Sequence, residues 1–297
     1  MNQQKFPIKV WLAFAAVALF WGTTFLGMRI GIQTFPPFLL AGLRHTIGGV
    51  IICSYFLLRG YKIPDKKELK VFAINGFLMM VCGNGLVCYA EMYISSGLAA
   101  LICSLTPIWL VLINSTTSKT ESINKITIAG FLLCFLAQFL LFKDHIKELG
   151  NTQYLYGIIA VTIANFCWAL GSIYSKHHKY EINSLYAAGL QMIFGGIMLD
   201  IYSISTGDLN NLNPSSESIY ALAYLIIFGS IIAYGSYIYI LKNMPAAIVS
   251  TYAYINTIVA VILGWLWFNE IMNLQMAFAV LLTLFGLWLV NKSMNKT

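Results

Sequence analysis

The chain repeats its own sequence pattern once, with an offset of about 147 residues along its 297 positions. The matching landmarks are Ala41-Gly42-Leu43 with Ala188-Gly189-Leu190, Gly48-Gly49 with Gly195-Gly196, Trp21 with Trp168, Arg29 with Lys176, and Ala99-Ala100 with Ala246-Ala247. One offset that recovers matches across half of the chain indicates a tandem duplication. In membrane proteins such internal repeats are typical of transporters, in which two related halves move about a central site.

The composition indicates a lipid bilayer as the solvent, because 59% of the residues are hydrophobic and only 10% are charged. Soluble domains are nearer a quarter charged. A membrane-spanning helix needs about 20 apolar residues. We predict ten such segments, at residues 10–28, 36–58, 70–92, 97–115, 123–142, 154–175, 184–204, 218–241, 245–268 and 272–291. The predicted fold class is an all-α integral membrane protein with ten transmembrane helices.

Five helices in each half oblige the second half to enter the membrane from the face opposite to the first. The predicted repeats, residues 8–147 and residues 153–292, therefore form a 5+5 inverted-topology arrangement. With the N-terminus inside, nearly all of the 18 Lys and Arg residues fall on the inner side; the exceptions are Arg29, Lys143, Lys147 and the intrahelical Arg44. This bias predicts that both termini are cytoplasmic. It also explains the net charge of +7 without a nucleic-acid partner.

The sequence contains no motif for a nucleotide, a metal ion or a catalytic nucleophile. GxxxxGK[ST], GxSxG and HExxH are all missing, and the adjacent His177-His178 pair would diverge on a helix. The six cysteines lie in apolar segments without CxxC spacing, which is typical of buried structural thiols. We therefore predict no cofactor, no metal site and no enzymatic activity.

Three stretches of the sequence carry a family resemblance. Phe20-Trp21-Gly22-Thr23-Thr24-Phe25 gives a WG-x-x-F pattern in the first predicted helix. Residues 89–101, followed by Thr106-Pro107, cover the junction of the third and fourth helices, and Glu270 precedes the last helix. In this order they resemble the EamA family of the drug/metabolite transporter superfamily, over about residues 8–292. The resemblance implies a ten-helix bundle in the bacterial inner membrane that moves small solutes by alternating access.

The two halves depart from each other at two positions that matter. Tyr254 stands where the repeat would place a second Pro107, so we expect no proline kink in the second half. Gln191 stands where it would place a second Arg44. The halves are therefore expected to contribute unequally to a site.

Arg44 and Glu91 are the most informative charges. Arg44 lies about eight residues inside the second predicted helix, where a charge costs about 2.5–3.5 kcal/mol. It must face a cavity or a partner, so it either contacts substrate or is bonded structurally. Glu91 ends the third helix between two tyrosines. Its carboxylate can serve the next helix N-terminus, take part in proton or cation coupling, or lie at the interface.

The predicted substrate site combines polar and aromatic residues at depth, since small-molecule sites are mostly apolar walls with a few placed polar groups. Gly83-Asn84-Gly85 predicts an interrupted helix, a feature of segments that line substrate sites. The candidate substrate contacts are Trp21, Thr24, Arg44, Asn84, Glu91, Thr106, Asn165, Trp168, Tyr234, Tyr237, Tyr252 and Asn256. The structural alternative is that these aromatic residues belong to interfacial belts.

The function predicted from these features is a secondary transporter that exports small metabolites, such as amino acids or related solutes, across the cytoplasmic membrane. A channel-like facilitator is the first alternative, because a monomeric pore need not carry a filter motif. A polytopic membrane enzyme is the second. The expected partners are a small-molecule substrate and the bilayer, with proton coupling open and with a monomer or a homodimer as the working unit.

Overall fold

The computed structural model is a helical bundle in which each predicted span coincides with one helix or with consecutive helical pieces. It describes residues 6–117, 125–143, 151–178, 180–210, 212–244, 246–268 and 274–294, and these residues form no β-strand. Lys147 and Glu270 lie outside the described residues.

The first half contains five helical runs. They are α1 (Ile8–Gly31), α2 (Pro37–Leu58), a third run of α3 (Lys66–Asn75), the π-helix η1 (Gly76–Gly85) and α4 (Leu86–Ala90), a fourth run of α5 (Ser96–Cys103) and α6 (Thr106–Thr117), and α7 (Lys125–Lys143).

The second half contains the corresponding runs. They are α8 (Thr152–His177), α9 (Ser184–Ser205), a third run of α10 (Ser216–Tyr224), the π-helix η3 (Leu225–Tyr234) and α11 (Gly235–Asn243), a fourth run of α12 (Ala246–Val249) and α13 (Tyr252–Phe268), and α14 (Leu274–Met294).

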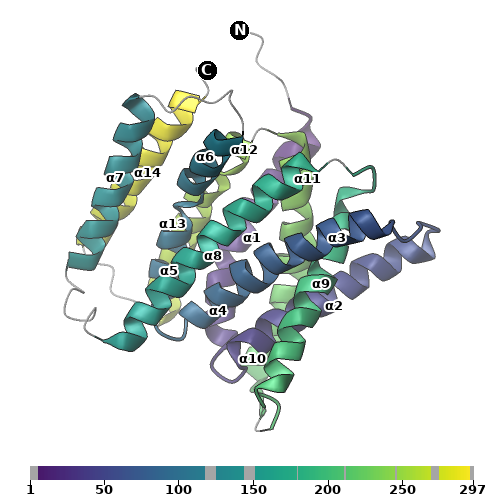
Figure 1. Cartoon of the computed structure of the whole chain (residues 1–297). Helices are drawn as coiled ribbons and strands as arrows, with labels where there is room; N and C mark the ends of the chain where they lie inside the picture. The colour runs from purple at the N-terminus through teal and green to yellow at the C-terminus, as the bar shows by residue number, and fades with distance from the viewer. Residues whose placement is uncertain are drawn as a thin grey trace.

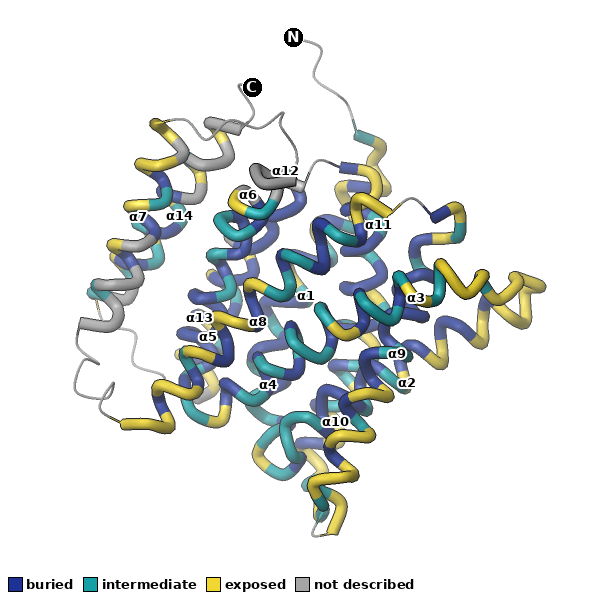
Figure 2. Tube along the Cα trace, in the orientation of Figure 1, coloured by how far each residue is buried: buried dark blue, intermediate teal, exposed yellow. Residues whose placement is uncertain are grey.

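Six runs of described residues are long and apolar enough to cross a membrane: Ile8–Gly31, Pro37–Leu58, Lys66–Ala90, Thr152–His177, Ser184–Ser205 and Ser216–Asn243. Their outward faces are apolar. Leu12, Leu19 and Ile201, for example, are each more than half exposed. Figure 2 shows the buried residues along the inward sides of the helices and exposed residues along the outer faces. Lipid, rather than water, satisfies such a surface.

The halves pack against each other through specific pairs of helices. α2 lies against α9, and α7 lies against α14 at one side of the bundle (Figure 1). α1 packs against α13, whereas α8 packs against α6 and η1. The start of α1 and the end of α14 lie at the same end of the molecule (Figure 1). Elements from both halves therefore surround the centre of the bundle.

The fourth run of each half is broken by side chains that bond to the backbone. In the first half Ser104 Oγ donates to the carbonyl of Leu101 at 2.6 Å, and in the second Thr251 Oγ1 donates to the carbonyl of Ile248 at 2.7 Å. Such bonds compete with the helical pattern. Both fourth runs break at equivalent places, so the break in the second half forms without a counterpart of Pro107.

The contact between α2 and α9 depends on Gly49. A larger residue at this position would push the two backbones apart. A Cβ added at Gly49 would lie 2.7 Å from the carbonyl oxygen of Gly189 and 2.9 Å from the backbone nitrogen of Ile193. A Cβ at the neighbouring Gly48 would meet chiefly the flexible end of Met192, at 2.7 Å. Small residues allow this close approach of helices in membranes.

Gly49→Ala is therefore expected to lower the free energy of unfolding by about 1–3 kcal/mol, the usual cost of overpacking. Gly48→Ala, its matched control, is expected to cost much less because Met192 can change rotamer. The midpoints of thermal unfolding in detergent micelles measure both effects. Equal midpoints for the two variants would contradict the close approach of α2 and α9 at Gly49.

Candidate functional site

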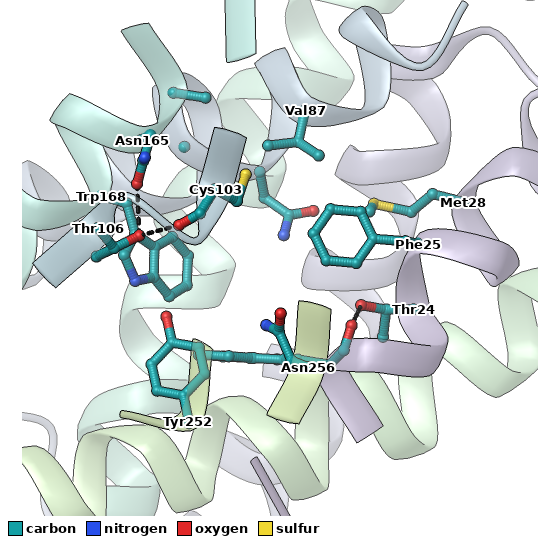
Figure 3. Close-up of a pocket in the computed structure, with 14 residues that line it drawn as sticks. Thr24, Phe25, Met28, Val87, Cys103, Thr106, Asn165, Trp168, Tyr252 and Asn256 are labelled. Carbon is teal, nitrogen blue, oxygen red and sulfur yellow. Dashed lines mark hydrogen bonds between the residues drawn. The ribbon is translucent and has the colours of Figure 1, made fainter. Parts of the chain in front are cut away.

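A cavity of about 70 Å³ lies in the centre of the bundle. Its walls come from α1, from η1 and α4, from α5 and α6, from α8, and from α13, so both halves contribute. Eight of the twelve residues that the sequence proposes for substrate contact line it: Trp21, Thr24, Asn84, Thr106, Asn165, Trp168, Tyr252 and Asn256. Figure 3 labels all of them except Trp21 and Asn84 around the open space.

Aromatic rings form one wall of the cavity, and Trp21 is at their centre. Its ring centroid lies 5.2 Å from that of Trp168 and 5.1 Å from that of Tyr252, with both pairs edge to face. Its indole Nε1 donates to the carbonyl of Gly229 in η3 at 3.1 Å. Edge-to-face aromatic pairs favour fixed geometry. The repeat-related Trp21 and Trp168 thus meet, with a ring from α13, at the boundary between the halves.

Some polar groups of the cavity make hydrogen bonds within the protein, and others make none with the described residues. Asn165 Oδ1 accepts from Thr106 Oγ1, and its Nδ2 donates to the carbonyl of Ile102 at 2.8 Å. These bonds satisfy backbone and side-chain groups at the break between α5 and α6. Asn256, only 6% exposed, has an Oδ1 that makes no hydrogen bond with any described residue. A buried acceptor without a partner is energetically costly. Asn256 Oδ1 is therefore well placed to accept a hydrogen bond from a ligand.

Arg44 does not line the cavity but lies directly behind it. Its Nε donates to Ser230 Oγ in η3 at 3.1 Å, and its Nη1 donates to the cavity residue Asn84, at Oδ1, at 3.2 Å. The side chain is 1% exposed. Arg44 therefore connects the π-helices of the two halves through hydrogen bonds to side chains of each.

The remaining proposed residues have other positions. Tyr237 packs behind the aromatic wall, with its ring centroid 4.9 Å from that of Trp21 and its hydroxyl 2.7 Å from Ser172 Oγ. Tyr234 is equally buried and donates to Gln191 Oε1. Glu91 is buried at the end of α4 and does not contribute to the cavity wall. No charged side chain is among the cavity-lining residues that the structure describes.

Sequence reasoning missed the apolar part of the lining. Phe25, Met28, Val87 and Cys103 face the same space (Figure 3). Each lies three or four positions from a polar or aromatic candidate: Phe25 from Trp21, Met28 from Thr24, Val87 from Asn84, and Cys103 from Thr106. Helical periodicity applied to the candidates would have found them.

Comparisons with known proteins agree with this architecture. The model of the EamA-like transporter family matches the chain twice, at residues 8–143 and 155–292. The "Uncharacterized inner membrane transporter YedA" of Escherichia coli (strain K12) is 32% identical over 254 residues, which cover 85% of this chain and 80% of that protein. The "Uncharacterized transporter YoaV" of Bacillus subtilis (strain 168) is 24% identical, over 95% and 96% of the two chains.

A solved crystal structure shares the fold. It superposes with a TM-score of 0.69 at 20% sequence identity and covers 95% of this chain and 98% of its own. The family match extends over almost the whole sequence, and the apolar helices of the structure agree with a multi-pass membrane protein. This chain is therefore a membrane transporter that belongs to the EamA-like transporter family.

Proposed function

We propose that the chain is a secondary transporter that exports small metabolites, such as amino acids or related solutes, across the bacterial inner membrane by alternating access. It is built as ten transmembrane helices in two inverted repeats, residues 8–147 and 153–292, with both termini in the cytoplasm. The observation that carries the proposal is the central cavity, whose walls come from both halves. Transporters with inverted repeats bind their substrates at such a repeat interface.

Equivalent hydrogen bonds in the two halves support the repeat. Arg44 and Gln191 occupy matching positions on α2 and α9. Arg44 bonds to Asn84 in η1, and Gln191 bonds to Tyr234 in η3, each near the end of the π-helix of its own half. π-Helical turns are rare and concentrate at functional sites. Their recurrence at one place in both halves is what a duplicated functional element predicts.

The proposed substrate contacts are divided between recognition of an apolar body and recognition of a polar group. Trp21, Trp168 and Tyr252 offer ring surfaces, while Asn256 offers an acceptor that the described residues leave free. A few placed polar groups in an apolar wall fix the orientation of a small ligand. The chemistry of this wall suits a solute with an apolar portion and at least one hydrogen-bond donor.

Counterflow in proteoliposomes tests the proposal, with a panel of labelled amino acids and amines supplied outside vesicles that are loaded with the unlabelled compound. A carrier gives saturable exchange that is accelerated by the unlabelled compound on the opposite side. Flux that rises linearly with the concentration of the compound would indicate a channel-like facilitator instead of a carrier. Chemical conversion of the compound would indicate a membrane enzyme instead of a carrier.

Asn256→Leu is expected to raise the KM for exchange by about tenfold or more, because a lost buried hydrogen bond is worth about 1–3 kcal/mol. Leucine keeps the number and branching of the side-chain heavy atoms while removing the acceptor. Ile255→Leu is the matched control, since Ile255 is its neighbour on α13 and faces outward at 42% exposure. An unchanged KM in Asn256→Leu would remove Asn256 from the binding site.

A further inference from the structure

The last turn of α1 is tied to the junction between α4 and α5 by Arg29. Its guanidinium Nη1 donates to the backbone carbonyl of Glu91 and lies 3.4 Å from that of Ile94. Both carbonyls belong to the short connection between the end of α4 at Ala90 and the start of α5 at Ser96. This cation therefore joins two helical runs that are about 60 residues apart in the sequence.

The last turn of α8 carries an equivalent cation. Lys176, the repeat mate of Arg29, donates from Nζ to the backbone carbonyl of Met244 at 2.9 Å. Met244 lies two residues before α12, as Ile94 lies two residues before α5. The same contact is thus built twice with different residue types, although neither α1 nor α8 requires it for its own helical hydrogen bonds.

Each contact joins two elements that line the central cavity, but at opposite ends of it. Arg29 follows the cavity residue Met28, and the junction that it holds separates Val87 from Cys103, which also line the cavity. Lys176 lies two turns beyond Trp168, and the junction that it holds leads into the helix of Tyr252. α1 and α8 run in opposite directions (Figure 1), so the two cations lie at opposite ends of the bundle.

We propose that Arg29 and Lys176 are opposing latches, Arg29 closing the cavity at its outer end and Lys176 closing it at its inner end. The proposal rests on the alternating-access function and the orientation argued above. Loss of one latch shifts the carrier toward the state that is open at that end, because an equilibrium moves when one state loses an interaction that the other does not make.

The two latches differ in strength, and the outer one is the stronger. Arg29 is half-buried, whereas Lys176 is exposed. A hydrogen bond shielded from water is worth more than an exposed one. The outer end is therefore held shut more strongly, so the empty carrier opens more often to the cytoplasm. That is the side from which an exporter takes its substrate.

Cys103 provides a native reporter for the test, because it lines the cavity and is partly accessible. The other five cysteines are replaced by alanine, and a membrane-impermeant maleimide is applied to right-side-out and to inverted vesicles. We expect Arg29→Gln to raise the rate of labelling from outside by roughly tenfold, the effect of losing one charged hydrogen bond. We expect Lys176→Gln to raise labelling from inside by a smaller factor.

Matched variants separate a latch from a merely structural cap. Arg59→Gln removes an exposed cation near Tyr55 at the end of α2 and is expected to leave both rates unchanged, while Arg29→Lys should retain part of the closure. Three results would overturn the proposal. Arg29→Gln and Lys176→Gln could both raise labelling from the same side, or each variant could raise labelling equally from both sides. In the third, neither variant changes the labelling rates.

The labelling needs no substrate, so it fails separately from the proposed function. Opposite shifts in the two variants, together with no counterflow of any solute, would support the latches and count against the transport assignment. Saturable counterflow in the wild type with no shift in either variant would overturn the latches and leave the transporter in place.

Discussion

Trp21→Ala is expected to abolish measurable counterflow and to lower the free energy of unfolding by about 3–5 kcal/mol, the range for truncating a buried tryptophan. The side chain is 9% exposed and holds together one wall of the cavity. Its removal takes away the ring contacts to Trp168, Tyr237 and Tyr252. It also leaves the Gly229 carbonyl without the bond that the indole donates. Initial rates of exchange and thermal unfolding midpoints in detergent measure the two effects.

Two further variants separate ring packing from the indole hydrogen bond. Trp21→Phe keeps an aromatic ring but loses the donor to Gly229, so it is expected to cost about 0.5–1.5 kcal/mol more than Trp168→Phe. The Nε1 of Trp168 makes no hydrogen bond with a described residue. Trp288→Ala is the matched control for truncation, because Trp288 is 47% exposed on α14. Equal losses in Trp21→Ala and Trp288→Ala would contradict a central role for Trp21.

The helical character of these apolar segments was predictable because the bilayer imposes a simple rule on the chain. A segment of about 20 apolar residues must close its own backbone hydrogen bonds, and a helix is the structure that does so. The interruption around Gly83-Asn84-Gly85 was also readable, and the structure has a π-helix there. The break at Ser250–Thr251 was not, since it depends on which hydroxyl bonds to the backbone.

The set of residues that line the cavity was only partly predictable, because tertiary packing sets the rotation of each helix about its axis. Tyr237 and Tyr252 are both deep aromatic residues, yet Tyr252 lines the cavity and Tyr237 packs behind it. Nothing local to α11 or α13 distinguishes them. The depth of Arg44 predicted that it needs partners, but Ser230 is 186 residues away. Such a contact follows from how the halves dock, which no short motif encodes.

Arg44→Ala is expected to reduce exchange by at least about tenfold and to destabilise the protein by about 2–5 kcal/mol, the cost of truncating one partner in a buried charged hydrogen-bonded network. The guanidinium holds Asn84 of η1 and Ser230 of η3 at once. It also occupies the space beside Gly229, where an added Cβ would lie 2.8 Å from Nη2. Without it, the two π-helices lose their common partner and the cavity residue Asn84 loses its fixed orientation.

The choice of replacement distinguishes a connecting role from a charge that attracts substrate. Arg44→Gln supplies the side chain found at the matching position of α9 and can bond to only part of the network, so it is expected to restore stability more than transport. Arg44→Lys keeps the charge but lacks the planar fork that reaches two acceptors, so we expect it to resemble Arg44→Gln. If Arg44→Lys instead exchanges like the wild type while Arg44→Gln does not, the charge itself acts on the substrate. Arg59→Ala, at the exposed end of the same helix, should leave both measurements unchanged.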